Sequence, residues 1–135
     1  MITYRVGNDL DLDEVIELYR ASTLGERRPV DDHGRMRLML QNANLVVTAW
    51  DGDLLVGIAR SMSDFCYATY LSDLAVRASH QRQGVGRELI RRTQIQGGQA
   101  MIVLLSAPKA VEYYPRIGLK PHPSAWILRA ENELR

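Results

Sequence analysis

Residues 71–89, LSDLAVRASHQRQGVGREL, contain the feature that most restricts what this chain can fold into. A strand-like run ends at Val76, a polar loop follows, and an amphipathic helix begins at Gly84 and Gly86. The first amides of a helix have no partner within it, and the helix dipole favours negative charge there. Glycines also let a pyrophosphate approach the backbone closely. The segment therefore predicts a strand, a loop and a helix whose start binds an anion.

Two better-known nucleotide-binding motifs do not fit this turn. A P-loop needs Lys-Ser or Lys-Thr after its glycines, and none follows here. A dinucleotide-binding turn needs a third glycine at a set spacing, which is also missing. A glycine pair is equally compatible with an ordinary helix start, so the rest of the chain must decide between the two interpretations.

Patterns along the chain predict alternating strands and helices in a single domain, residues 1–135. Strands are expected at residues 2–6, 45–50, 54–61, 66–76, 101–105, 119–120 and 125–129. Helices are expected at residues 12–22 after an Asp11 cap, 31–42, 84–96 and 107–114. The Asp-Gly turn at residues 51–53 predicts an antiparallel hairpin, and the strand–helix–strand order from 70 to 105 predicts a parallel pair. The unbroken apolar run 101–105 predicts a strand buried on both faces.

Composition narrows the class of protein. The hydrophobic content of 46% and charged content of 24% are typical of a globular domain and exclude general disorder. The single cysteine, Cys66, excludes a disulfide framework and a cysteine-rich zinc site, and the three histidines lack metal-ligand spacing. No apolar run is long enough to span a membrane, and the first residues do not resemble a signal peptide. We therefore expect a cytoplasmic protein without a bound metal.

Two motifs together resemble a known family. The first is Gln81-x-x-Gly84-x-Gly86 after a strand ending in DLAV. The second is AVEYYPRIGL at residues 110–119, which is similar to an Ala-x-x-aromatic-Tyr-x-x-x-Gly-Phe pattern. Both patterns are typical of the GNAT superfamily of N-acetyltransferases, and the order of elements resembles that family over essentially the whole chain. The resemblance implies an α/β (α+β) fold, with a mixed, mostly antiparallel central sheet, a splayed parallel strand pair and helices on both faces.

The resemblance also implies acetyl-CoA as co-substrate. The strands at 70–76 and 101–105 would splay to leave its cleft. Backbone groups of three strand residues would meet the pantetheine and acetyl portions, namely Leu74, Ala75 and Val76. The loop and helix start would hold the pyrophosphate through Gln81, Arg82, Gln83, Gly84, Val85, Gly86 and Arg87. Ala107 stands where the family often has an asparagine, so one side-chain contact to the cofactor is missing.

The implied activity is transfer of an acetyl group from acetyl-CoA to a primary amine, by direct attack in a ternary complex. Tyr114 would protonate the departing thiolate, although a helix-end tyrosine can equally pack on the core. Asp73 is the first candidate for the base that deprotonates the amine, and its other interpretation is a strand acid that bonds to a loop. Three acids in the loop at 23–34 are alternatives, Glu26, Asp31 and Asp32. Cys66 lacks the paired histidine that an acyl-carrying thiol needs.

Charge distribution suggests the acceptor. Residues 1–64 hold 7 basic and 11 acidic side chains, whereas residues 65–135 hold 10 basic and 5 acidic ones. An acidic half containing the acceptor loop would suit a small cationic amine. The net charge of +1 argues against a nucleic-acid partner. Two alternatives stay open, a non-catalytic acyl-CoA-binding module and an acetyltransferase acting on a protein terminus or other macromolecule. Family members are frequently dimers, so the resemblance also allows a homodimer.

Overall fold

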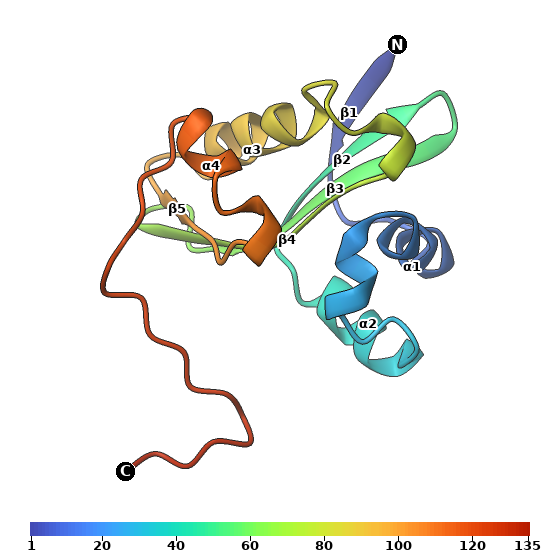
Figure 1. The fold of residues 1–135 in the computed structure, drawn as a ribbon. Helices are drawn as coiled ribbons and strands as arrows, with labels where there is room; N and C mark the ends of the chain where they lie inside the picture. The colour runs from blue at the N-terminus through green and yellow to red at the C-terminus, as the bar shows by residue number, and fades with distance from the viewer. The chain divides into compact units, whose positions relative to one another are not determined.

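The computed structural model describes residues 1–135, which form two compact units, Met1–Leu105 and Ser106–Arg135. The first unit contains a five-stranded sheet in the order β1-β2-β3-β4-β5 (Figure 1). Its strands are β1 (Ile2–Val6), β2 (Leu45–Asp51), β3 (Leu54–Ser63), β4 (Ala68–Val76) and β5 (Met101–Val103). Strands β1 to β4 pair antiparallel, and β4 pairs parallel with β5. The mixed, mostly antiparallel sheet is therefore confirmed, while the organisation as one domain stays a prediction.

Helices cover both faces of this sheet (Figure 1). Two neighbouring residues of β3 define the faces, because successive side chains of a strand point in opposite directions. A Cβ atom at Gly57 would lie 3.0 Å from Leu89 of α3 (Val85–Gln96). Ile58 instead belongs to the apolar core that includes residues of α1 (Leu12–Ala21) and α2 (His33–Gln41). Thus α3 packs on one face, and α1 and α2 pack on the other.

Local sequence accounts for the helix starts. The Asp11 carboxylate accepts a hydrogen bond from the Asp13 amide at 3.1 Å, which caps α1 as its sequence predicts. Asp32 caps α2 in the same way through the Arg35 amide. The buried side of α1 then presents an apolar stripe, with Tyr19 fully buried near its end. No helix in the structure combines the length and the apolar character needed to cross a membrane.

The prediction for residues 101–105 is wrong in one respect. Strand β5 lies at the edge of the sheet, and the side chains of Met101 and Val103 are 52% and 44% exposed. The run is therefore not buried on both faces. An apolar run indicates only that a strand is favourable. Whether another element covers each face of that strand depends on the rest of the fold.

The second unit departs further from expectation. The strands predicted at 119–120 and 125–129 are not formed. Pro121 and Pro123 interrupt this stretch and remove two backbone donors, so a regular ladder is disfavoured. The helix predicted at 107–114 is replaced by a 3₁₀ turn, Pro108–Ala110, and the short helix α4 (Tyr113–Arg116).

Candidate active site

The outer edge of β4 is the first component of the site. Its parallel ladder with β5 covers only three residues, ending at Tyr70 opposite Val103. Beyond that point β4 continues to Val76 without a partner on this side. The strands predicted to splay therefore do pair briefly and then separate.

A β-bulge accompanies the separation. Arg60 of β3 pairs with Asp73, but the next residue, Ser61, pairs with Leu71, so Ser72 is an extra residue in β4. A bulge bends its strand and shifts the alternation of side chains by one position. Before the bulge, Thr69 faces α3, because its hydroxyl lies 3.0 Å from where a Cβ at Gly97, the C-cap of α3, would stand. After the bulge, Ala75 belongs to the apolar core on the opposite face, so the odd-numbered residues of β4 have changed face.

The direction of the β4 peptide groups follows from one hydrogen bond. The Arg77 amide donates to the Val56 carbonyl of β3 at 2.8 Å. Because peptide groups alternate along an antiparallel strand, those of Ala75 also face β3, and those of Leu74 and Val76 face the unpaired edge. Leu74 and Val76 thus offer backbone groups outward as expected, whereas Ala75 uses its own in the sheet. The Gln81 side-chain amide donates to the Val76 carbonyl at 2.9 Å, which ties the loop to this edge.

The start of α3 is the second component. Gly84 has φ +83°, a left-handed conformation that glycine adopts without strain, and Arg82 has φ +61°. None of the amides of residues 82–87 donates to an acceptor within the protein. A Cβ at Gly84 would meet nothing within 4 Å, so the backbone here is open to an approaching group. Converging free amides at a helix start suit a phosphate group.

Side chains around this turn divide into two roles. Val85 is buried and packs towards Gly57, so only its amide is available to a ligand. Arg82, Gln83 and Arg87 are exposed and add two positive charges beside the free amides. The charge and the geometry together fit the pyrophosphate of a coenzyme A derivative.

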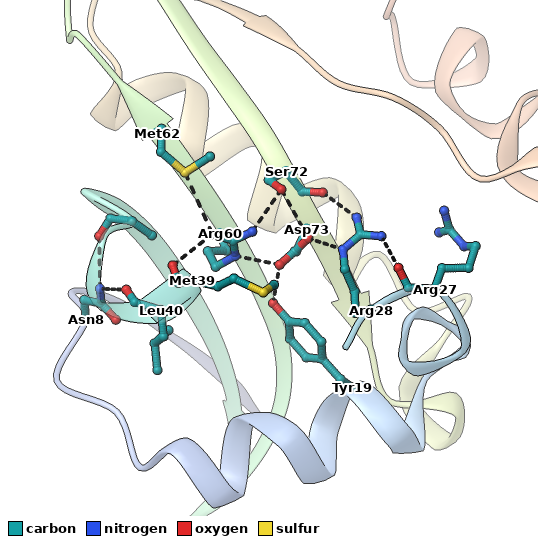
Figure 2. A network of polar contacts seen from close by, with 11 residues as sticks. Asn8, Tyr19, Arg27, Arg28, Met39, Leu40, Arg60, Met62, Ser72 and Asp73 are labelled. Carbon is teal, nitrogen blue, oxygen red and sulfur yellow. Dashed lines mark hydrogen bonds and ion pairs between the residues drawn. The ribbon is translucent and has the colours of Figure 1, made fainter. Parts of the chain in front are cut away.

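Asp73 lies in a buried polar cluster under the bulge (Figure 2). Its carboxylate is inaccessible to solvent and accepts from Arg60 Nε at 2.5 Å, from Tyr19 Oη at 2.6 Å and from Arg28 Nε at 2.6 Å. Arg60 also donates to the Met39 carbonyl at 2.9 Å and to Ser72 Oγ at 2.9 Å. The cluster, defined as Tyr19, Arg28, Arg60, Ser72 and Asp73, connects α1, the loop after it, β3 and β4.

The electrostatics of this cluster affect whether Asp73 can act as the base that deprotonates the amine. Burial alone would raise the pKa of Asp73, but hydrogen bonds and charge from Arg60, with Tyr19 and Arg28, hold that pKa below its usual value. Burial, together with the charge of Asp73, raises the pKa of Tyr19 well above its usual value. A carboxylate with a lowered pKa, no exposure and three strong donors is a poor proton acceptor. The geometry therefore favours the second interpretation of Asp73, an acid that bonds to a loop and holds it in place.

The three alternative acids of the loop at 23–34 differ in whether their carboxylates already bond to the protein. Asp31 pairs with Arg20 at 2.7 Å on the surface, and Asp32 caps α2. Glu26 is exposed within a 3₁₀ turn, Thr23–Arg27. Cys66 is exposed, and no group of three His, Cys, Asp or Glu side chains is arranged to hold a metal. Glu26 is thus the loop acid whose carboxylate is not already used in the fold.

Tyr114 belongs to the second unit. It lies in α4, and its ring meets that of Tyr113 edge-on with centroids 5.3 Å apart. Ala107 precedes the 3₁₀ turn of the same unit and forms no side-chain cap there. The catalytic role of Tyr114 stays a prediction.

Sequence reasoning missed four members of the buried cluster, Tyr19, Arg28, Arg60 and Ser72. A signal was present for Arg60, because it stands in the middle of the apolar strand LLVGIARSMS and a buried charge needs a partner. Asp73 stands in a similar apolar strand, so the pair could have been anticipated. No comparable signal marks Arg28, which lies in a charged loop and reaches the cluster only through the tertiary fold.

An unpaired strand edge beside a helix start with free amides is an arrangement suited to a phosphate-bearing ligand that lies along a strand. A family model for the acetyltransferase (GNAT) domain matches residues 22–126, most of the chain. The chain therefore belongs to the GNAT acetyltransferase family, which confirms the resemblance of its motifs.

Known proteins extend this assignment. The GNAT-family protein SP0256 from Streptococcus pneumoniae shares 27% identity and a TM-score of 0.76, covering 96% of this chain and 99% of that one. The aminoglycoside N-acetyltransferase AAC(6′)-Iy, solved with CoA, has the same fold at 17% identity and TM-score 0.73, covering 98% and 96%. The histone acetyltransferase TAP1 of Glycine max is 33% identical over 72 residues, 51% of this chain and 31% of that protein. The chain thus spans less than a third of the length of that curated relative.

Proposed function

We propose that this protein is an acetyl-CoA-dependent N-acetyltransferase whose acceptor is a primary amine. The observation that carries the proposal is the free amides of residues 82–87 beside the unpaired edge at Leu74 and Val76. The first would bind the pyrophosphate, and the second would align the pantetheine and the thioester. Acetyl-CoA supplies an activated acetyl group, and the protein supplies position and polarity. The solved CoA complex of AAC(6′)-Iy, which has the same fold, supports this choice of co-substrate.

Transfer forms a bond between the amine nitrogen and the acetyl carbon and breaks the bond from that carbon to sulfur. Holding the two reactants together can contribute roughly 7–11 kcal/mol to the barrier reduction. Negative charge develops on the carbonyl oxygen, and an outward amide of β4, at Leu74 or Val76, would donate to it. These steps need only peptide groups that the splayed strand leaves available.

Three proton transfers accompany the reaction: the ammonium loses one proton before attack, the nitrogen loses a second once it has bonded to the acetyl carbon, and the departing sulfur gains one. An aliphatic amine has a pKa of about 10, so it arrives as an ammonium and must lose a proton before attack. Because Asp73 is buried and ion-paired, we propose that this proton leaves through water, with exposed Glu26 as the nearest acidic alternative in the loop. Tyr114 is proposed to protonate the thiolate that departs.

The acceptor class follows from the same reasoning. The sequence favours a small cationic amine. A primary amine in its ammonium form carries that positive charge at the nitrogen that reacts. The similarity to the soybean histone acetyltransferase over 72 residues keeps a protein acceptor as the second candidate. Peptides therefore belong in any substrate screen beside small amines.

A screen for free thiol tests the proposal. Purified protein with acetyl-CoA is offered polyamines, aminoglycosides, amino acids and peptides, and thiol release is followed together with CoA binding by calorimetry. We expect release with at least one class. Arg87→Gln should weaken CoA binding. Arg37→Gln removes the same charge at an exposed position of α2 and should not weaken it. CoA binding without release on any acceptor would support a non-catalytic binding module, and absence of CoA binding would refute the proposal altogether.

A further inference from the structure

Arg28 is held in a fixed orientation at the point where β4 leaves β5. Its Nε donates to Asp73 Oδ1 at 2.6 Å, its Nη2 to the Ser72 carbonyl at 2.8 Å and its Nη1 to the Arg27 carbonyl at 2.8 Å. A guanidinium has five N–H donors, so two remain without an acceptor in the protein. The side chain is 21% exposed, so it is partly accessible from the surface.

The charge at this place is positive. Arg28 and Arg60 share the single carboxylate of Asp73, so the buried cluster has one positive charge in excess. Arg27 is exposed, and its side chain takes part in no ion pair. Figure 2 shows the Arg28 guanidinium next to Ser72, and the side chain of Arg27 extending to the same side farther from Ser72. Two neighbouring guanidinium groups, one of them anchored, are an arrangement that binds carboxylates.

The position matters for the reaction. Arg28 bonds to the carbonyl of Ser72, two residues before Leu74 on the same strand. Strands rise about 3.3 Å per residue, so this guanidinium lies about 7 Å along β4 from Leu74, the nearer of the two residues whose peptide groups are proposed to meet the thioester. An acceptor whose amine reaches the thioester would place atoms a few bonds away beside Arg28.

We propose that the acceptor carries an anionic group, a carboxylate, that binds Arg28 and Arg27 while its amine faces the thioester. This inference rests on the proposed function and makes it more specific. The acceptor is then a small amino carboxylate, cationic at the reacting nitrogen and anionic at its other end. Of the three acids in the loop at 23–34, Asp31 and Asp32 are used in the fold, so exposed Glu26 is the one loop carboxylate that competes for these arginines.

Matched acceptors test the proposal. Amino carboxylates with two to five methylene groups between amine and carboxylate are compared with their carboxamides, so that only the anion changes. We expect kcat/KM to be about tenfold higher for the preferred carboxylate, equivalent to about 1.4 kcal/mol. Arg27→Gln should remove most of that preference by raising KM for the carboxylate more than for the carboxamide. Arg35→Gln, at an exposed position of α2, is the control for loss of one positive charge elsewhere.

A binding readout keeps this test separate from that of the activity. The NMR signal of the Arg28 Nε–H, recorded on the CoA-loaded protein, should shift when the carboxylate is added and not when the carboxamide is added. If that shift is seen but no acceptor releases thiol, the proposed function fails and the anion site stands. Equal rates for the two series, or a preference for polyamines, would overturn the anion site even if the enzyme is active. No shift with any carboxylate would also overturn it.

Discussion

Replacing Asp73 with asparagine separates a structural role from a catalytic one. The aspartate accepts from Arg60 and Tyr19 through Oδ2 and from Arg28 through Oδ1. Asparagine offers one oxygen and one NH₂ group, so either orientation points N–H donors at a guanidinium. The substitution also leaves the charge of Arg60, whose side chain is 8% exposed, without its partner.

The expected cost follows from this geometry. Removing one member of a buried ion pair costs about 3–5 kcal/mol, because the other charge stays buried without compensation. A domain of this size has a free energy of unfolding of about 5–15 kcal/mol, so the variant should unfold at much lower urea concentration. Tyr19→Phe removes one hydrogen bond to the same carboxylate and should cost less, about 1.5–3 kcal/mol.

Acid should reveal the same interaction. The pKa of Asp73 is lowered in the folded protein, so its contribution to stability is complete above the unfolded value of about 3.9. That contribution is lost as the pH falls through the lower, folded value. Urea unfolding measured between pH 7 and pH 3 should therefore show wild-type stability falling at the acid end, with a smaller loss in Asp73→Asn.

The opposite pattern would refute this reasoning. If Asp73→Asn unfolds within about 1 kcal/mol of wild type, the buried pair does not stabilise the fold in the way described. If the variant also loses the acidic limb of its pH–rate profile, Asp73 is the general base that the sequence suggested. Retention of that limb, with reduced stability, would establish the structural role.

Other predictions concern the two proposed binding regions. Gly84→Ala places a Cβ at a residue with φ +83° and should cost about 1–2 kcal/mol in stability while weakening CoA binding, measured by urea unfolding and calorimetry. Gly34→Ala is the control: its Cβ would lie 3.9 Å from the nearest neighbouring atom at an ordinary φ, so neither the stability nor CoA binding should fall as they do in Gly84→Ala. Tyr114→Phe should lower kcat with little change in the Kd for acetyl-CoA; unchanged turnover with the true acceptor would exclude its role as the acid. Arg27→Gln should raise KM for amino carboxylates more than KM for their carboxamides.

Local patterns alone predicted much of the fold. The Asp-Gly turn determined the hairpin of β2 and β3, since Gly52 adopts φ +61° at the tip and the alternating residues beside it have a strand period. Asp11 determined where α1 begins, because a cap acts on amides two or three residues away. The glycines before α3 determined the turn with free amides for the same reason. All of these interactions join residues that are close together in the chain.

Features that join distant residues could not be predicted in this way. Apolarity of residues 101–105 did not show that β5 is an edge strand, because its exposure depends on which elements cover it. The bulge at Ser72 arises from the register between β3 and β4, and it brings Asp73 onto the face of Arg60 and Tyr19. The sequence placed an acid on the strand predicted to line the acetyl group but could not tell whether it is a base or an anchor.

The sequence by itself determined the family and the turn before α3, since short motifs carry the local backbone geometry on which both depend. Only the tertiary structure decided which side chains surround Asp73 and where Arg28 lies. A carboxylate changes from proton acceptor to fixed counter-ion according to the charges that surround it, and here those charges come from residues 13 and 45 positions away in the chain. Two donors of Arg28 have no acceptor in the protein, because the other three bond to Asp73 and Ser72 of β4 and to the Arg27 carbonyl.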